Sequence, residues 1–440
     1  MKKLVGIFLV VLAFLLLVPF LIPTGTYLKQ AEKIASDKLN QPVTIGAMHL
    51  ALLPSPRANI RDLVIGKDQE VKVGGIAVLP ELGSLFSGVK TISLIEVTDP
   101  VIKKGALDFI AAMPKSAPST EPATLLVQRL RVKNAQFIWP DIRIPAMNAE
   151  ATLAADNHLQ ALKLTSDDGH LKADVTPVDA GYAIKLDAID WTMPAGPKVL
   201  FNHLNAEMSL QGSKLRITSL EAMLYQGALS SNAELDWGKG LRASGKFNTD
   251  NISVGDAAQL FSKEKLISGK LSGAGSFGLE SKEAAKAIDH LVLDYKFSVA
   301  NGVLHGVDLA KAATLMLNTG DKGGDTQFDE LSGTLHTVGK TIELKAFKVS
   351  SGLLAAHGGV KVLPSRQLDG VVEVELKEGM ALASVPLQVS GTLDHPSVFP
   401  TKAALAGAAI GTGVLGPGVG TTLGVKAASG IDKLKGLFSK

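Results

Sequence analysis

The chain has 440 residues, of which 46% are hydrophobic, and this excludes a mainly disordered protein. Its 45 basic and 42 acidic side chains are spread without a basic block, so the electrostatic footprint of a nucleic-acid-binding protein is absent. The lack of cysteine excludes disulfides, thiolate catalysis and cysteine-ligated metal. The 44 glycines, with only 5% aromatic residues, favour a long twisted sheet over a helical bundle.

An uncharged, strongly apolar run extends from Leu4 to Ile22, directly after Lys2 and Lys3. As a helix it would cover roughly 28 Å, about the hydrocarbon thickness of a bilayer, and the lysines favour a cytoplasmic amino end. We predict a signal anchor over residues 1–23. A cleaved signal peptide is the alternative, but its apolar region normally has about 7–15 residues. The side chains predicted to form the membrane anchor are Leu4, Val5, Ile7, Phe8, Leu9, Leu12, Phe14, Leu15, Leu16, Leu17, Phe20, Leu21 and Ile22.

The next elements change from helix to strand. Thr26–Leu39 has apolar residues at helical spacing and predicts a short amphipathic helix near the membrane. Residues 43–104 alternate apolar and polar positions between Gly and Pro breaks, which predicts four or five strands. The predicted organisation is a signal anchor (1–23), an amphipathic helix with a β-unit (24–113), a Pro- and Ser-rich linker (114–122), a repeated β-sheet unit (123–402) and a glycine-rich apolar tail with an amphipathic helix (403–440).

The large β-unit contains a diffuse internal repeat. Three copies span residues 147–169, 204–227 and 331–352, and each ends on a glycine. In the second and third copies a turn glycine, Gly212 or Gly339, follows the first strand. The repeat therefore predicts an antiparallel meander with one apolar face, and this face must be covered or must hold a guest.

Three short helical segments interrupt this unit, at 254–261, 282–288 and 307–317. None is long enough to cover the whole apolar face. The face therefore closes an ordinary core with the help of sheet curvature, or it leaves an open or ligand-filled groove, and patterning alone does not separate the two.

The tail is apolar but poorly suited to a helix, because residues 403–425 contain seven glycines and Pro417. Small-residue spacing such as Gly407/Gly411 would let a helical hairpin pack closely in or on a bilayer, and a buried or flexible apolar loop is the alternative. Residues 431–440 predict a last amphipathic helix whose lysines suit an anionic membrane surface.

The sequence shows no recognisable catalytic chemistry. Two stretches, Gly273–Gly278 and Gly411–Gly416, match a dinucleotide fingerprint by letter, but neither has the βαβ context that presents a helix amino end to phosphate. The first predicts a glycine-bearing strand instead. The nine histidines never show metal-ligand spacing, and a GxSxG elbow is absent. We predict no catalytic residues, no metal and no cofactor; an envelope hydrolase is the less favoured alternative.

Three segments in the last third carry a family resemblance. They are ANGVLHGVDLAKA (300–312), TQFDELSGTLHTVGKTIELKAFKVSSG (326–352) and PLQVSGTLDHPSVFPT (386–401), in that order. Together they resemble the AsmA family of membrane-anchored periplasmic proteins, particularly its carboxyl domain. The anchor, the short helix and the following LNQPVTIG resemble AsmA-like and chorein-related amino ends, which makes 24–113 a chorein-like β-unit.

The resemblance implies a fold class and a location. The fold would be mainly β, with an amino-terminal transmembrane helix followed by an elongated, curled antiparallel sheet with a hydrophobic groove and a few short helices. The protein would be a single-pass protein of the inner membrane of a Gram-negative bacterium, with most of its chain in the periplasm. It would support phospholipid movement to, or assembly of, the outer membrane, and it brings no catalytic residues.

A groove lined by alternate strand residues can remove acyl chains from water at ~0.8 kcal/mol per buried CH₂ while head groups stay solvated. The predicted partners are phospholipids and the membrane, with a second membrane contact through 403–440. A non-transporting envelope scaffold that assists outer-membrane protein assembly is the alternative. The residues predicted to line the groove are Leu215, Ile217, Ile342 and Leu344.

Overall fold

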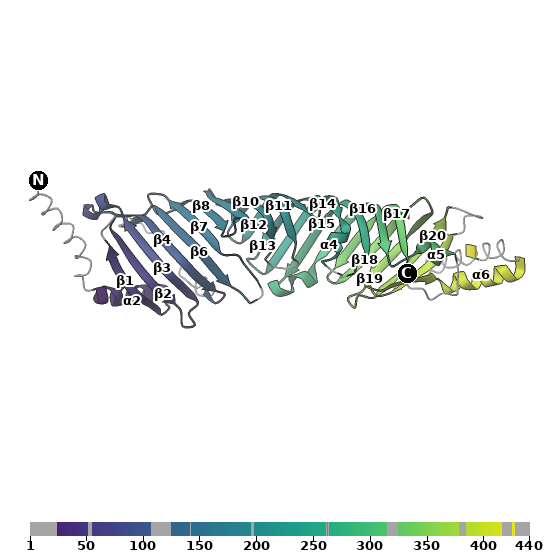
Figure 1. The fold of residues 1–440 in the computed structure, drawn as a ribbon, viewed down its shortest axis with the longest axis horizontal. Coiled ribbons are helices and arrows are strands. Elements are labelled where there is room, and N and C mark those ends of the chain that lie inside the picture. Colours follow the sequence, from purple (N-terminus) through teal and green to yellow (C-terminus); the bar gives the residue numbers. More distant parts are fainter. Residues whose placement is uncertain are drawn as a thin grey trace, which may run out of the picture. The chain divides into compact units, whose positions relative to one another are not determined.

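A computed structural model describes residues 24–51, 55–106, 125–140, 142–194, 198–260, 262, 264–314, 324–377, 384–415 and 425–426. The chain divides into two compact units at residues 198 and 199. Figure 1 shows that strands dominate both units. The predicted anchor (1–23) and linker (114–122) lie outside the described residues. No helix within the described ranges is both long and apolar enough to cross a bilayer.

The first unit is a sheet preceded by one helix. Its elements are α2 (Thr24–Leu39), β1 (Val43–Ala51), β2 (Arg57–Ile65), β3 (Val71–Pro80), the 3₁₀ helix η1 (Leu82–Phe86), β4 (Lys90–Lys103), β5 (Leu125–Val127), β6 (Arg129–Ile138), β7 (Met147–Leu153), β8 (Leu159–Ser166), β9 (Leu171–Val178) and β10 (Gly181–Thr192). The predicted amphipathic helix is confirmed as α2, and β1–β4 agree with the four or five strands predicted over residues 43–104.

Helix α2 packs on β1 and bonds to its backbone. Glu32 accepts a hydrogen bond from the Ile45 amide at 2.7 Å, and Ser36 accepts one from the Val43 amide at 3.0 Å. The same two strand residues are buried, because the alternation of β1 directs their side chains to the covered face. The helix therefore packs on the sheet and also uses two polar side chains to bond the backbone of β1.

The strand order of this unit contains one exception to the predicted antiparallel pattern. β4 pairs in parallel with β5 and β6, for example Val97 with Val132. The other pairings between the described strands of this unit are antiparallel. A parallel pair needs a crossover connection. Residues 104–124 separate β4 from β5 in the sequence and include the predicted linker; of these, only 104–106 are described.

The second unit is an antiparallel meander in which each strand pairs with the next along the chain. Its strands are β11 (Leu200–Gln211), β12 (Lys214–Leu224), β13 (Gly227–Asp236), β14 (Leu241–Ser253), β15 (Ile267–Ser281), β16 (Val292–His305), β17 (Asp325–Val338), β18 (Thr341–Ser350), β19 (Leu354–Val362), β20 (Leu368–Leu376), β21 (Ser384–Gly391) and β22 (Pro396–Pro400).

The predicted repeat is confirmed as repeated strand–turn–strand structure. Gly212 and Gly339 are the turn residues between β11 and β12 and between β17 and β18, with φ of 59° and 57°. These left-handed conformations favour glycine. The predicted strand over Gly273–Gly278 is also confirmed, since the whole stretch lies inside β15.

The helices of this unit are short, as predicted, and one more is present. They are α4 (Val254–Ala258), the 3₁₀ helix η2 (Ala284–His290), α5 (Leu309–Ala313) and α6 (Lys402–Leu415). The expectation that the tail suits a helix poorly is wrong for 402–415. Five alanines in its first eight residues explain the helix, because alanine has the highest helix propensity.

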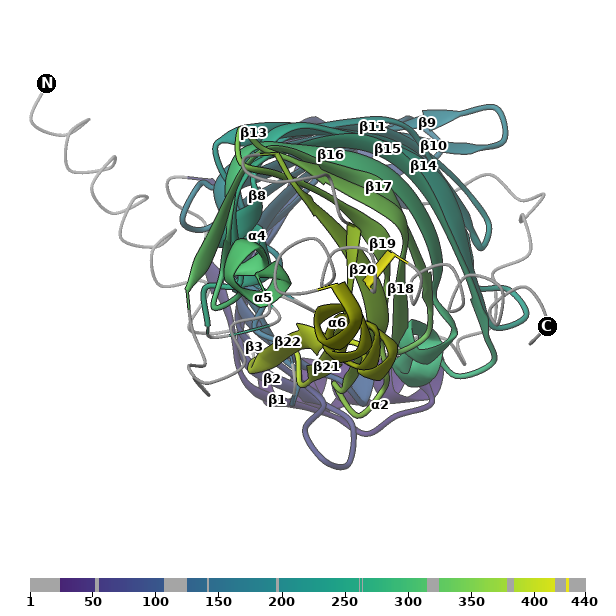
Figure 2. The same ribbon diagram turned by 90° about the vertical axis from the view of Figure 1, so that its right-hand side faces the viewer.

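One end of the second unit is closed by its own core. Its buried members are Val299, Leu309, Ala313, Phe328, Leu331, Phe347, Val349, Leu354, Ala356, Val372, Val374, Val385, Leu387, Val389 and Val425, and we call this set the closed core. α5 contributes to it by packing on β17, β20, β21 and β22. Figure 2 shows α5 inside the curl of these strands. Val425, a residue of the tail, is also buried in this core.

A polar contact joins distant parts of the chain around the closed core. Ser262, between α4 and β15, donates a hydrogen bond at 2.8 Å to Asp394 in the β21–β22 turn, 132 residues away. Arg366 in the β19–β20 turn donates to both oxygens of the same carboxylate at 2.8 Å. The Ser262 hydroxyl and the Arg366 guanidinium hold the pKa of Asp394 below its usual value. These three residues, here the latch, hold the curled strands together.

The latch predicts an acid-sensitive contribution to stability. Because the folded pKa of Asp394 is lowered, its contribution is present above the ordinary Asp pKa and is lost as the pH falls through the lower folded value. We expect Asp394→Asn to be less stable than wild type at pH 7 in urea unfolding, and the difference to shrink below about pH 4. An equal difference at pH 7 and pH 3 would contradict a role for this carboxylate.

Glycines on β15 make room for aromatic rings of the neighbouring strands. A Cβ on Gly275 would lie 2.7 Å from the Phe247 ring and 2.6 Å from the Asp294 carbonyl oxygen. We expect Gly275→Ala to destabilise the protein by about 1–3 kcal/mol, measured by chemical unfolding, because the ring and backbone must move. Gly278→Ala on the same strand is the matched control, since nothing lies within 4 Å of its added Cβ. Equal effects of the two substitutions would refute the packing argument.

Candidate functional site

The candidate site is the face of the second unit's sheet that continues from the closed core, here the inner face. Cross-strand registers define its rows of side chains, because directly opposed residues of paired strands point to the same face. One row joins Ile217, Ala233, Gly245, Phe277, Leu293, Thr337 and Ile342 across β12–β18. A row beside it joins Leu215, Leu235, Ala243 and Leu279 across β12–β15. We call these two rows the inner strip.

The large side chains of the inner strip are only half-buried, in contrast to those of the closed core. Leu215 and Ile217 on β12, Phe277 on β15 and Ile342 on β18 all retain partial exposure. Phe347 and Val349, further along β18, are 6% and 2% exposed. Along β18 alone, the inner face therefore changes from a half-buried side chain at Ile342 to buried ones at Phe347 and Val349.

The structure brings the four predicted groove residues onto one face. Ile217 and Ile342 lie in the same cross-strand row, and Leu215 lies in the adjacent one. Leu344 lies opposite Leu335 in the next row and packs against the closed core. Their roles in binding remain predictions, but the alternation pattern that selected them identified a shared face.

An aromatic cluster separates the inner strip from the closed core. The Tyr295 ring stacks on Phe247 at a centroid distance of 5.3 Å and on Phe297 at 5.8 Å. Tyr295 and Thr249 share a hydrogen bond between their hydroxyl groups, and burial raises the pKa of the tyrosine. Phe297 packs against the closed core. The sequence offered only scattered aromatic residues here, because their contact depends on strand register.

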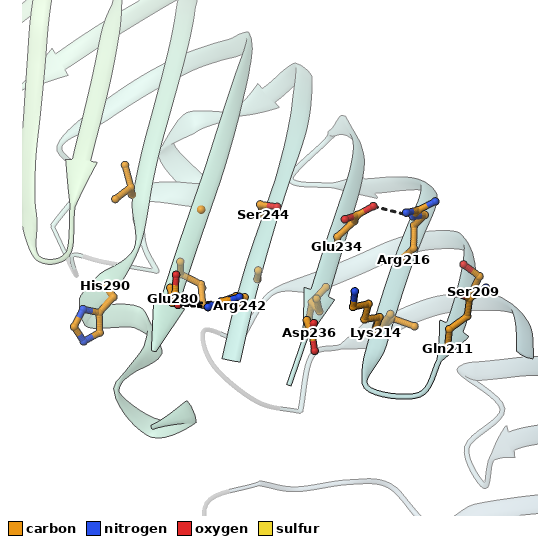
Figure 3. A pocket seen from close by; sticks show the side chains of 16 residues that line it. Ser209, Gln211, Lys214, Arg216, Glu234, Asp236, Arg242, Ser244, Glu280 and His290 are labelled. Atoms are coloured by element: carbon orange, nitrogen blue, oxygen red, sulfur yellow. Dashed lines mark hydrogen bonds and ion pairs between the residues drawn. The ribbon is translucent and has the colours of Figure 1, made fainter. Parts of the chain in front are cut away.

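A hollow of about 750 Å³ at the ends of β11–β16 is lined by charged side chains and also by four inner-strip residues, Leu215, Leu235, Ala243 and Leu279. Figure 3 shows its charged side chains projecting from neighbouring strands, with Arg216 and Glu234 joined by an ion pair. That pair measures 2.8 Å, and Arg242 approaches Glu280 to 2.7 Å. All four side chains are more than 60% exposed, so the pairs contribute little to stability. The hollow therefore adjoins the row of the inner strip that begins at Leu215.

A second polar arrangement links Ser268, His305 and Asp325. The Ser268 hydroxyl lies 3.1 Å from His305 Nε2, and His305 Nδ1 lies 3.1 Å from Asp325 Oδ2. The Gly306 amide donates to the other carboxylate oxygen at 3.2 Å, and this bond together with His305 lowers the pKa of Asp325. Sequence reasoning missed the series because its members lie on three strands that only register brings together.

This connectivity is that of a serine hydrolase, which also needs oxyanion donors and a pocket for the acyl group. The contacts of the described residues define neither beside Ser268. In the same part of the chain, no three His, Asp or Glu side chains gather closely enough to hold a metal ion.

We expect a fluorophosphonate probe to leave Ser268 unlabelled, because without oxyanion donors the hydroxyl gains little reactivity from His305. Intact-protein mass spectrometry of the treated full chain measures this. Stoichiometric labelling that disappears in both Ser268→Ala and His305→Ala would instead support the hydrolase alternative.

The fold and the site define a class, a β-rich protein whose meander sheet has a half-open apolar inner face beside a closed core. Residues 142–339 match the AsmA family, so this part of the chain is similar to proteins of that family. The family resemblance stated from the sequence is thereby confirmed, and the match includes its first segment, 300–312. The closing segment, 386–401, lies beyond the matched residues. No curated protein and no solved structure gives a significant match.

Proposed function

We propose that this protein binds phospholipid on the inner face of its second unit and supports lipid transport to, or assembly of, the outer membrane. The observation that carries the proposal is the half-buried state of Leu215, Ile217, Phe277 and Ile342 on one face. Similarity to the AsmA family points to the same envelope role. The apolar run at residues 4–22 supports an inner-membrane anchor with the rest of the chain in the periplasm.

The energetics suit an aliphatic ligand. Apolar surface left in contact with water carries an unfavourable free energy of about 25 cal/mol per Å², which covering by an acyl chain relieves. The inner strip supplies leucine, isoleucine and phenylalanine side chains, with Thr337 its one polar member. A lipid head group, by contrast, gains nothing from leaving water, so it would stay outside the strip.

Native mass spectrometry with lipid extraction tests this proposal on the full chain, because truncation before Val425 would remove a residue of the closed core. We expect co-purified phospholipid in the wild type and more than about a tenfold loss in Ile217→Asp, since a buried carboxylate costs well over 1.4 kcal/mol. Ser230→Asp is the matched control, because Ser230 is exposed on the neighbouring strand and lies opposite Glu221 and Asn248 on the outer face.

Leu344→Asp is a poorer test than Ile217→Asp, because Leu344 packs against the closed core and its loss would also weaken the fold. A folded wild-type protein that carries no lipid would overturn the proposal. The scaffold alternative would then gain support, since the hollow at the ends of β11–β16 carries the exposed charged side chains of Arg216, Arg242 and Glu280, which suit contacts with another protein.

A further inference from the structure

We propose that acyl chains lie along the inner strip across the strands, in single file, with the aromatic cluster as the lateral border that keeps them out of the closed core. This inference rests on the proposed function and adds the orientation and width of the binding site. It assigns the site to extended aliphatic chains rather than to compact apolar molecules.

The dimensions of the inner strip set the orientation. On β12–β15 the strip is two inward-facing positions wide, such as Leu215 and Ile217, and these span about 7 Å, whereas on β16–β18 it is one position wide. Across the strands the row from Ile217 to Ile342 crosses β12–β18, which is roughly 29 Å at ~4.8 Å per strand. An extended acyl chain can therefore bury its length only by crossing the strands.

The floor of this path is shaped for a continuous chain. Gly245 lies between Ala233 and Phe277 in the row, and a Cβ on it would meet the Phe277 ring at 2.7 Å. The ring therefore leans over the glycine backbone instead of standing away from the sheet. The polar member of the row, Thr337, is only 9% exposed, so it interrupts the apolar floor little.

The position of the lateral border is inferred from the burial of Tyr295 and of the residues beyond it. Tyr295 is 8% exposed and lies one row beyond Phe277, stacked between Phe247 and Phe297. Beyond it, Val299 is 1% exposed in the closed core. The space on the far side of Tyr295 is already occupied by the chain's own side chains, which include Leu309 and Ala313 of α5. A chain in the inner strip can thus reach the tyrosine but cannot pass it.

Quenching of single tryptophans by brominated phospholipid tests this geometry. The three native tryptophans, Trp139, Trp191 and Trp237, are replaced by phenylalanine in the full chain. One tryptophan is then introduced in each variant at Leu235, Phe277, Ile342 or Phe347, and each protein is loaded from vesicles of phosphatidylglycerol brominated along one acyl chain. Lipid occupancy of every variant is measured by native mass spectrometry.

We expect strong quenching at positions 235, 277 and 342, which lie on three different strands, and none at 347. Ile342 and Phe347 make the decisive comparison because both lie on β18. Equal quenching at these two positions would overturn the proposal, since the lipid would then run along a strand or enter the closed core. Bound lipid that quenches no tryptophan of the strip would also overturn it.

Absence of bound lipid in all variants and in the wild type would instead remove the proposed function itself, so the two failures are distinguishable. Phe347→Trp enlarges a side chain that is 6% exposed, and it could disturb the core. Hydrogen exchange of the wild type supplies an independent measurement. Lipid should increase protection in β12–β15 and leave β20 and β21 unchanged, and added protection in β20 and β21 would contradict the border.

Discussion

The period-two alternation of apolar side chains, carried from strand to strand by cross-strand pairing from β12 to β18, is the constraint on which the second unit depends. Each pairing carries the inward-facing set to the next strand, so Ile217 and Ile342 share a face although 125 residues separate them along the chain. A slip of one residue at any pair would turn every following side chain to the other face. The continuity of the inner face is therefore a property of the whole meander.

What covers this face decides its use. A five-residue helix is too short to cover a whole sheet. Where the strands curl, however, α5 contacts β17, β20, β21 and β22 and contributes Leu309 and Ala313 to the core between them. The latch then joins segments 132 residues apart and keeps that interior closed. Away from α5, the same alternation leaves side chains half-buried. A single sequence pattern thus produces a core in one region and an accessible apolar surface in another.

Several features of the fold could be predicted because they depend on local sequence. The glycine turns at Gly212 and Gly339, the amphipathic helix and the meander all follow from patterns of a few residues. The division between core and strip could not be predicted, because Leu215 and Val349 occupy equivalent alternating positions and differ only in what lies above them. The Ser268 series and the latch likewise depend on contacts between distant segments. The parallel pairing of β4 with β6 could not be predicted either, because it joins strands that are not consecutive in the sequence.

The contact between α2 and β1 has a consequence for assembly. A strand with free amides is a template to which another chain can add its own strand, which is one route to stacked aggregates. Here Glu32 and Ser36 already bond the Ile45 and Val43 amides, and the helix lies where an incoming strand would pair. This margin of the first unit is therefore sealed against strand addition, and a protein that extends the sheet by donating a strand would first have to displace the helix.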